Sequence, residues 1–194
     1  MSIFGKVFLP IACLTVTCVA WAQSINLGEQ APARFDVAFV YNPVLANVTN
    51  GSEFWMQGGS AQAEARLWRR LYGVADVAGL HTSNVNGSGI GLDLITATFG
   101  PRYTWSPHRR VALFGQVLAG EAHGFNSIFP SSSGTNSTGN SFALQIGGGV
   151  NLPLTYHFLV RAFDADWLRT QLPNATTNVQ NNLRLGIGMI YRIK

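Results

Sequence analysis

Cysteine, charge and long apolar runs are all scarce in this chain of 194 residues. The two cysteines, Cys13 and Cys18, lie close to the start, so residues 23–194 can form neither a disulfide nor a thiolate metal site. Only 11% of the residues are charged, about half the usual share, which is too few to coat a water-soluble surface. No stretch after residue 22 approaches 18 consecutive apolar residues, which excludes a bundle of membrane helices.

The first 22 residues have the features of a cleaved secretory signal. Residues 1–6 carry one positive charge, residues 7–19 are largely apolar, and Ala20-Trp21-Ala22 is a small-x-small cleavage site. A transmembrane helix is disfavoured because Pro10 interrupts a stretch that is short for a span of ~20 residues. We therefore predict a signal peptide over 1–22 and one domain over 23–194, with twelve Lys and Arg against nine Asp and Glu.

The last twelve residues alternate between apolar and other side chains. A period of two is typical of a strand with one greasy face, and eleven residues suffice for a tilted membrane-spanning strand. The apolar row consists of Leu183, Leu185, Ile187, Met189, Tyr191 and Ile193, and the other row holds Arg184, Gly186, Gly188, Ile190 and Arg192.

Polar turn segments divide the rest of the chain at regular intervals. Four long segments rich in Gly, Ser, Asn and Thr, at 42–52, 82–88, 122–141 and 171–181, alternate with three short basic turns at 66–70, 106–110 and 153–157. Seven connections join eight strands, which we predict at 34–41, 54–67, 71–81, 90–105, 111–120, 141–152, 158–170 and 183–193. Alternating long loops and short turns are typical of outer-membrane barrels. The predicted fold is therefore all-β, an eight-stranded antiparallel up-and-down transmembrane barrel, closed by pairing of its first and last strands.

The facing of the strands follows from the cost of charge in lipid. An arginine on the lipid face costs about 2 to 4 kcal/mol at the bilayer midplane, so the charged rows must face the lumen, which an eight-stranded barrel is narrow enough to fill with side chains. The predicted interior network consists of Arg34, Asp36, Glu64, Asp76, Arg102, Asp164, Asp166, Arg184 and Arg192, with Asp93 as a further partner. A soluble lipocalin-like barrel with the inverted pattern is the alternative, and the scarcity of Lys and Glu disfavours it.

The strand at 158–170 carries charges in both of its rows. We predict Asp164 and Asp166 inward, which places Arg161 and Arg169 on the lipid face near opposite ends, where their long side chains can reach the interface. Trp167 then joins an aromatic girdle, whose predicted members are Tyr41, Trp55, Tyr103, Trp167 and Tyr191.

The strands, the inward Arg and acidic residues and the amphipathic last strand resemble the small outer-membrane barrels of the OmpA and OmpX type. More narrowly, residues 74–76, 84–89, 99–103, 162–167 and 181–185 are similar to outer-membrane barrel proteins of acidobacterial genomes. The resemblance implies a bacterial outer-membrane location, contact with membrane lipid and lipopolysaccharide, and recognition of the last strand by the barrel-assembly machinery. That family usually ends on an aromatic residue, whereas this chain ends at Lys194, so the expected signal is either weakened or shifted to Tyr191.

The expected function is a non-catalytic, monomeric barrel with a filled interior that displays four surface loops. The segment at 122–141, which contains Phe125, Ile128 and Phe129, is the best place for a surface partner, although an unstructured loop without a partner is the favoured interpretation. A solute channel and a lipid-modifying enzyme that uses His81 and Ser83 are the alternatives. No cofactor or nucleic-acid partner is expected. A bound metal is not expected either, because no two histidines share a metal-ligand spacing.

Overall fold

The computed structural model describes residues 35–48, 52–85, 87–108, 110–131, 134–174 and 177–193. The predicted signal peptide and Arg34 lie outside these residues. Within the described part of the chain, no helix is long and apolar enough to cross a membrane.

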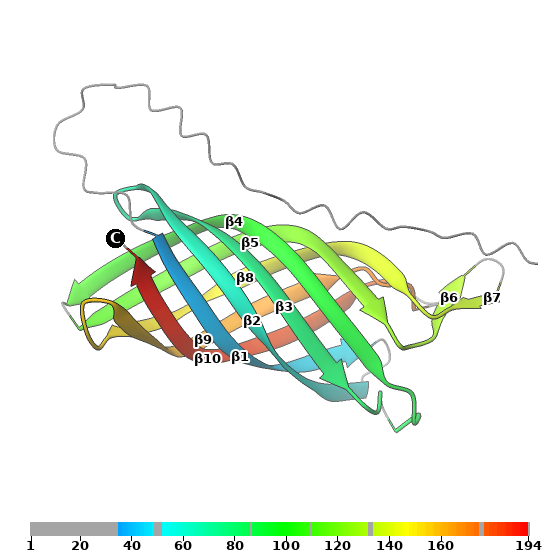
Figure 1. Ribbon diagram of the computed structural model, residues 1–194. Coiled ribbons are helices and arrows are strands. Elements are labelled where there is room, and N and C mark those ends of the chain that lie inside the picture. Colours follow the sequence, from blue (N-terminus) through cyan, green and yellow to red (C-terminus); the bar gives the residue numbers. More distant parts are fainter. Residues whose placement is uncertain are drawn as a thin grey trace, which may run out of the picture. The chain divides into compact units, whose positions relative to one another are not determined.

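Eight long strands form a closed antiparallel barrel, in the order β1-β10-β9-β8-β5-β4-β3-β2 (Figure 1). Their bounds are β1 Phe35–Val48, β2 Ser52–Trp68, β3 Leu71–Thr82, β4 Leu92–His108, β5 Val111–Phe125, β8 Gly139–Pro153, β9 Phe158–Thr170 and β10 Gln180–Ile193. Two short strands, β6 Phe129–Ser131 and β7 Gly134–Asn136, form a separate hairpin between β5 and β8. The predicted fold class is confirmed.

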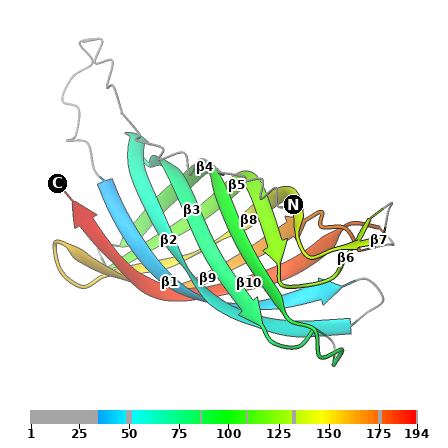
Figure 2. The ribbon, with the colours of Figure 1, turned by 45° about the vertical axis from the view of Figure 1, so that its right-hand side comes forward.

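The barrel closes along the seam between its first and last strands, as predicted. Phe35 pairs with Ile193, and the antiparallel register continues to Asn47 opposite Asn181. Closure satisfies the edge hydrogen bonds of both strands, which a lipid environment requires. The strands slant across the barrel wall, and the β6–β7 hairpin lies at the end opposite to the C-terminal end of β10 (Figures 1 and 2). We call the end with the hairpin the loop end and the other end the turn end.

Two of the predicted long loops contain more strand than expected. Residues 42–48 continue β1, and Asn42 and Val44 are buried. The segment 122–141 holds the end of β5, the β6–β7 hairpin and the start of β8. Polar composition was a poor guide here, because backbone pairing does not depend on side-chain polarity and strands can extend into water beyond the bilayer. The predicted turns at 66–70, 106–110 and 153–157 do coincide with the strand connections at the turn end.

The alternation along the strands separates two faces of the barrel wall. In β4, Ile95, Ala97 and Phe99 are exposed while Thr96 and Thr98 are buried, as the sequence pattern predicts. Every long strand contributes large hydrophobic residues to the exposed row. The buried row is apolar near both ends of the barrel and polar in the middle, so the interior has three layers.

Candidate functional site

The middle layer of the barrel interior is a hydrogen-bonded network of charged and amide side chains. Three arginines lie at its centre, Arg102 from β4, Arg161 from β9 and Arg184 from β10, and each is at most 1% exposed. They reach the interior because inward positions recur at every second residue of a strand.

Arg102 and Arg161 share one carboxylate, that of Glu64 on β2. Arg161 Nη2 lies 3.0 Å from Glu64 Oε1, and Arg102 Nη1 donates to the same oxygen. Both guanidinium groups also donate to Gln62 Oε1, and their Cζ atoms lie 4.4 and 4.7 Å from the centre of the Phe114 ring. The face of an aromatic ring attracts a cation. The Phe114 ring therefore helps to hold the two positive charges of this cluster side by side.

Arg184 forms the second cluster with Asp76 of β3. The pair is bidentate, with Nη1 to Oδ1 at 3.0 Å and Nη2 to Oδ2 at 2.9 Å, which is the strongest geometry for a guanidinium and a carboxylate. Arg184 also donates to Asn42 Oδ1 at 2.9 Å and to Ser60 Oγ at 2.8 Å. All of its nitrogens are therefore satisfied inside the protein.

Three glutamines connect the charged groups into one network. Gln62 donates to Asp76 Oδ2 at 2.6 Å and so joins the two arginine clusters. Gln116 accepts from Arg102 and donates to Asp166, and Gln145 donates to Asp166 at 2.7 Å. The predicted network contained only charged residues, although these amides occupy the same alternating rows.

The facing predicted for Arg161 is wrong. We expected it on the lipid face, but it is fully buried and its Nη1 lies 3.4 Å from Asp164 Oδ2. The cause is a β-bulge, because β9 has one more residue than β8 and β10 between Arg161 and Asp164, and Ala162 and Phe163 are both exposed. An extra residue reverses the facing of everything beyond it. Asp164 and Asp166 are buried, on the predicted side.

Three other residues predicted for the network lie away from it. Asp36 and Arg192 form a separate pair near the turn end, with Nε and Oδ1 3.5 Å apart. Asp93 does not reach the interior. It lies at the start of β4, where its Oδ1 is 2.6 Å from His81 Nδ1 and its Oδ2 accepts from Asn126. The prediction failed because Asp93 occupies the outward row.

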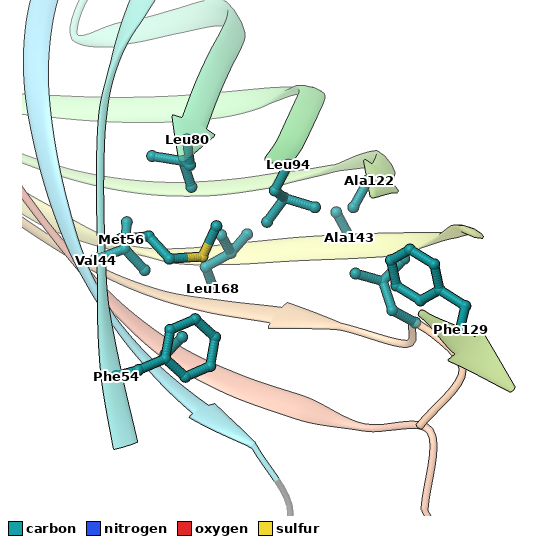
Figure 3. Close-up of a cluster of buried hydrophobic side chains, with 11 residues drawn as sticks. Val44, Phe54, Met56, Leu80, Leu94, Ala122, Phe129, Ala143 and Leu168 are labelled. Atoms are coloured by element: carbon teal, nitrogen blue, oxygen red, sulfur yellow. The ribbon is translucent and has the colours of Figure 1, made fainter. Parts of the chain in front are cut away.

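An apolar cluster fills the interior at the loop end, between the network and the loops. Figure 3 shows its side chains pointing toward one another from strands on different sides of the barrel. Phe129 of β6 is buried in this cluster, whereas Ile128 beside it is exposed. The cluster was not predicted from the sequence, because inward apolar residues such as Met56 and Leu94 lie among polar ones. Its buried members are Val44, Ala46, Phe54, Met56, Leu80, Leu94, Ala122, Phe129, Ala143, Leu168 and Leu172.

The predicted girdle residues all project from the outer face of the barrel. Their exposed fractions range from 39% to 53% for Tyr41, Trp55, Tyr103, Trp167 and Tyr191. Tyr191 packs against Phe158 and the His157 ring at the turn end. Among the described residues there is no group of three or more His, Cys, Asp or Glu that could hold a metal ion.

Closure, strand number and apolar outer face together define a small eight-stranded barrel of the outer-membrane type. The chain is similar to Ail, the attachment invasion locus protein of Yersinia pestis, with 16% identity over 84% of this chain and 100% of Ail and a TM-score of 0.58. It is also similar to Neisserial surface protein A, with 14% identity over 84% of this chain and 99% of that chain and a TM-score of 0.61. The recognition of an OmpA/OmpX-like barrel is thereby confirmed at the level of the fold.

No protein-family model matches the chain, and no curated protein matches it. The narrower resemblance to acidobacterial barrel proteins stays a prediction.

Proposed function

We propose that this chain is a non-catalytic, monomeric outer-membrane protein that displays its loops at the cell surface and conducts no solute. One observation carries the proposal: the interior is occupied by the arginine network and, toward the loops, by the apolar cluster. A lumen filled in this way leaves the loops as the part of the molecule that can contact other molecules. Contact with lipopolysaccharide, assembly through β10 and export by the signal at 1–22 are parts of the same proposal.

The loop end carries little positive charge, and this limits the kind of surface partner that can bind there. A further structure of Ail, with a TM-score of 0.57 and 18% identity, is a complex with the heparin analogue sucrose octasulfate. Here Glu53 and Glu121 are exposed toward the loop end, and Arg169 is the one arginine among the described residues near it. We therefore do not extend a sulfated ligand to this chain. Its loop segments, rich in Asn, Ser and Thr, favour neutral polar contacts.

Surface display can be tested with an epitope tag. A tag inserted after Asn174, between β9 and β10 at the loop end, is expected to bind antibody on intact cells. The matched control carries the tag after Leu154, in the turn between β8 and β9, and should bind only after permeabilisation. Labelling of both variants on intact cells, or of neither, would contradict the proposed orientation.

The filled lumen has its own test. The purified protein should show heat-modifiable gel mobility, the mark of a folded barrel, and should not accelerate the swelling of liposomes in isotonic sugar solutions. A porin reconstituted at the same protein-to-lipid ratio provides the positive control. Swelling that depends on solute size would establish a channel instead.

A lipid-modifying enzyme is the second candidate, and the His81–Asp93 contact is the observation that favours it. An acid that orients a histidine is one part of a nucleophile-base system, and Ser83 follows two residues later. No hydrogen bond connects Ser83 with His81 among the described residues, which disfavours this candidate. We expect the protein to cleave no phospholipid ester in reconstituted vesicles. Ester cleavage that Ser83→Ala abolishes would make the barrel an enzyme.

A further inference from the structure

The charges on the barrel surface are distributed unequally between its two ends. Toward the turn end, Arg69, Arg70 and Arg110 are exposed and Arg66 is half-buried. Asp36 and its cross-strand partner Glu64 are the carboxylates nearest this rim among the described residues, and both are buried and paired with arginines. The turn end is therefore a cationic ring. In outer-membrane barrels the short turns face the periplasm, so this ring lies at the inner leaflet.

A groove of about 390 Å³ opens on the outer face beside this ring. Tyr103 and Trp105 of β4 form one side and Leu113 of β5 the other. Gly115 lies beside Tyr103 of β4 and opposite Gly148 of β8, and the two paired glycines supply no side chain to cover the wall. The result is a hollow in the lipid-facing wall, bordered by two aromatic rings that are about half exposed.

Arg70 closes the groove at its polar end. The turn that carries it leans on β4, because the backbone N–H of Thr104 donates to the Arg70 carbonyl oxygen at 2.8 Å. Among the described residues, none forms an ion pair or a side-chain hydrogen bond with the Arg70 guanidinium. Arg69, its neighbour, differs: its guanidinium lies 5.7 Å from the Trp68 ring and does not line the groove.

We propose that this groove binds an anionic phospholipid of the inner leaflet, with the phosphate on Arg70 and an acyl chain along the hollow at Gly115. A guanidinium matches the geometry of a phosphate, and Tyr and Trp lie at the headgroup level of a bilayer. The ring of arginines without an exposed carboxylate selects a lipid of net negative charge over a zwitterionic one. The inference goes beyond the proposed function and requires only that the barrel spans a bilayer.

Tryptophan quenching by brominated lipids tests the site directly, because Trp105 lies in it. The full chain with Phe at Trp21, Trp55, Trp68 and Trp167 retains Trp105 as its one tryptophan. It is reconstituted in phosphatidylcholine vesicles that contain brominated phosphatidylglycerol or, separately, brominated phosphatidylcholine, and its tryptophan is excited selectively over tyrosine. We expect phosphatidylglycerol to displace phosphatidylcholine at Trp105 with an exchange constant of about five, the factor for one basic side chain near an anionic lipid.

Substitution of two adjacent arginines in one turn distinguishes lipid binding at a specific site from a diffuse electrostatic attraction of anionic lipid to the turn end. Arg70→Gln should lower the exchange constant to about one, while Arg69→Gln, which removes the same charge from the adjacent residue, should change it by less than about twofold. Gly115→Leu fills the hollow and should weaken quenching by both lipids. A Cβ at Gly115 would meet its nearest atom at 3.8 Å, so this variant has room to fold.

The outcomes distinguish this inference from the proposed function. An exchange constant of one for the starting protein, or equal losses for Arg69→Gln and Arg70→Gln, would overturn the phospholipid site and leave the barrel in place. Failure of the unsubstituted chain to insert, seen as a gel mobility that heat does not change, would overturn the membrane barrel itself.

Discussion

Individual side chains in the barrel interior depend on one another for their charge partners. Asp76 is fully buried, and its carboxylate faces the Arg184 guanidinium and the Gln62 amide. Removing one member of a buried ion pair leaves the other charge without compensation. The side chains of the network therefore stabilise the barrel jointly. Each of them contributes to the free energy of unfolding only while its partner is present.

Arg184→Met tests this dependence. The substitution keeps an unbranched apolar stem but leaves Asp76 without its guanidinium partner, so we expect a loss of ~3 to 5 kcal/mol in the free energy of unfolding. In the double variant with Asp76→Asn, the loss should be clearly smaller than the sum of the two single losses. Urea unfolding in phospholipid vesicles measures all four proteins. Additive losses would mean that the pair contributes nothing as a pair.

At the scale of the element, β9 is irregular where the sequence pattern was ambiguous. Its bulge allows Arg161 and the two aspartates to face inward together. In a regular strand Arg161 and Asp164, which are three positions apart, would face opposite sides. Regular alternation would send Arg161 to lipid at a cost of about 2 to 4 kcal/mol near the midplane. The bulge avoids that cost and supplies Glu64 with a second cation.

Deleting single residues from β9 tests the bulge. Deletion of Ala162 removes the extra residue and leaves Arg161 facing inward, so we expect a folded barrel whose stability lies within about 2 kcal/mol of the starting protein. Deletion of Ala165, at a regular position of the same strand, reverses the facing of every residue on one side of it and should prevent folding. Heat-modifiable mobility separates the two outcomes. Equal failure of both deletions would argue against the bulge.

The β6–β7 hairpin is an element whose position depends on one anchor. Phe129 is 5% exposed in the apolar cluster, whereas Ile128 is 56% exposed. Phe129→Ala removes buried contacts worth ~3 kcal/mol, so we expect cleavage by an added protease between β5 and β8 to become at least about tenfold faster. Ile128→Ala should leave that rate unchanged. If both substitutions act equally, the hairpin is not anchored through Phe129.

At the scale of the whole barrel, two separate layers obstruct the lumen in series. The arginine network fills the middle, and the apolar cluster fills the loop end. An ion would have to pass both, and an apolar layer without water excludes ions even where the network is opened. The proposed closed lumen would therefore be blocked at two levels.

The double variant Arg102→Ala, Arg161→Ala tests the second of these levels. It removes two guanidinium groups from the middle layer and leaves the apolar cluster intact, so planar bilayers that contain the folded variant should show no steady ion conductance. The starting protein provides the baseline, and heat-modifiable mobility verifies that the variant is folded. A cation-selective conductance, with Glu64 exposed to the pathway, would show that the network alone closes the lumen.

The sequence by itself determined the strand number, the closure and the facing of seven strands. These follow from local periodicity, because a period of two and the cost of charge in lipid leave one arrangement for rows such as Leu183 to Ile193. The predicted inward placement of Glu64, Asp76, Arg102 and Arg184 rests on the same argument, and all four are buried in the network.

Only the tertiary structure decided which side chains meet inside the barrel. Arg161 and Glu64 are 97 residues apart in the chain, and their contact depends on the shear of the sheet and on the bulge at Ala162, neither of which has a local sequence signal. The same holds for the groove at Gly115, which depends on the register of β5 against β4 and β8. Periodicity fixes the face on which a residue lies, whereas its neighbours on that face are set by strand register around the closed barrel.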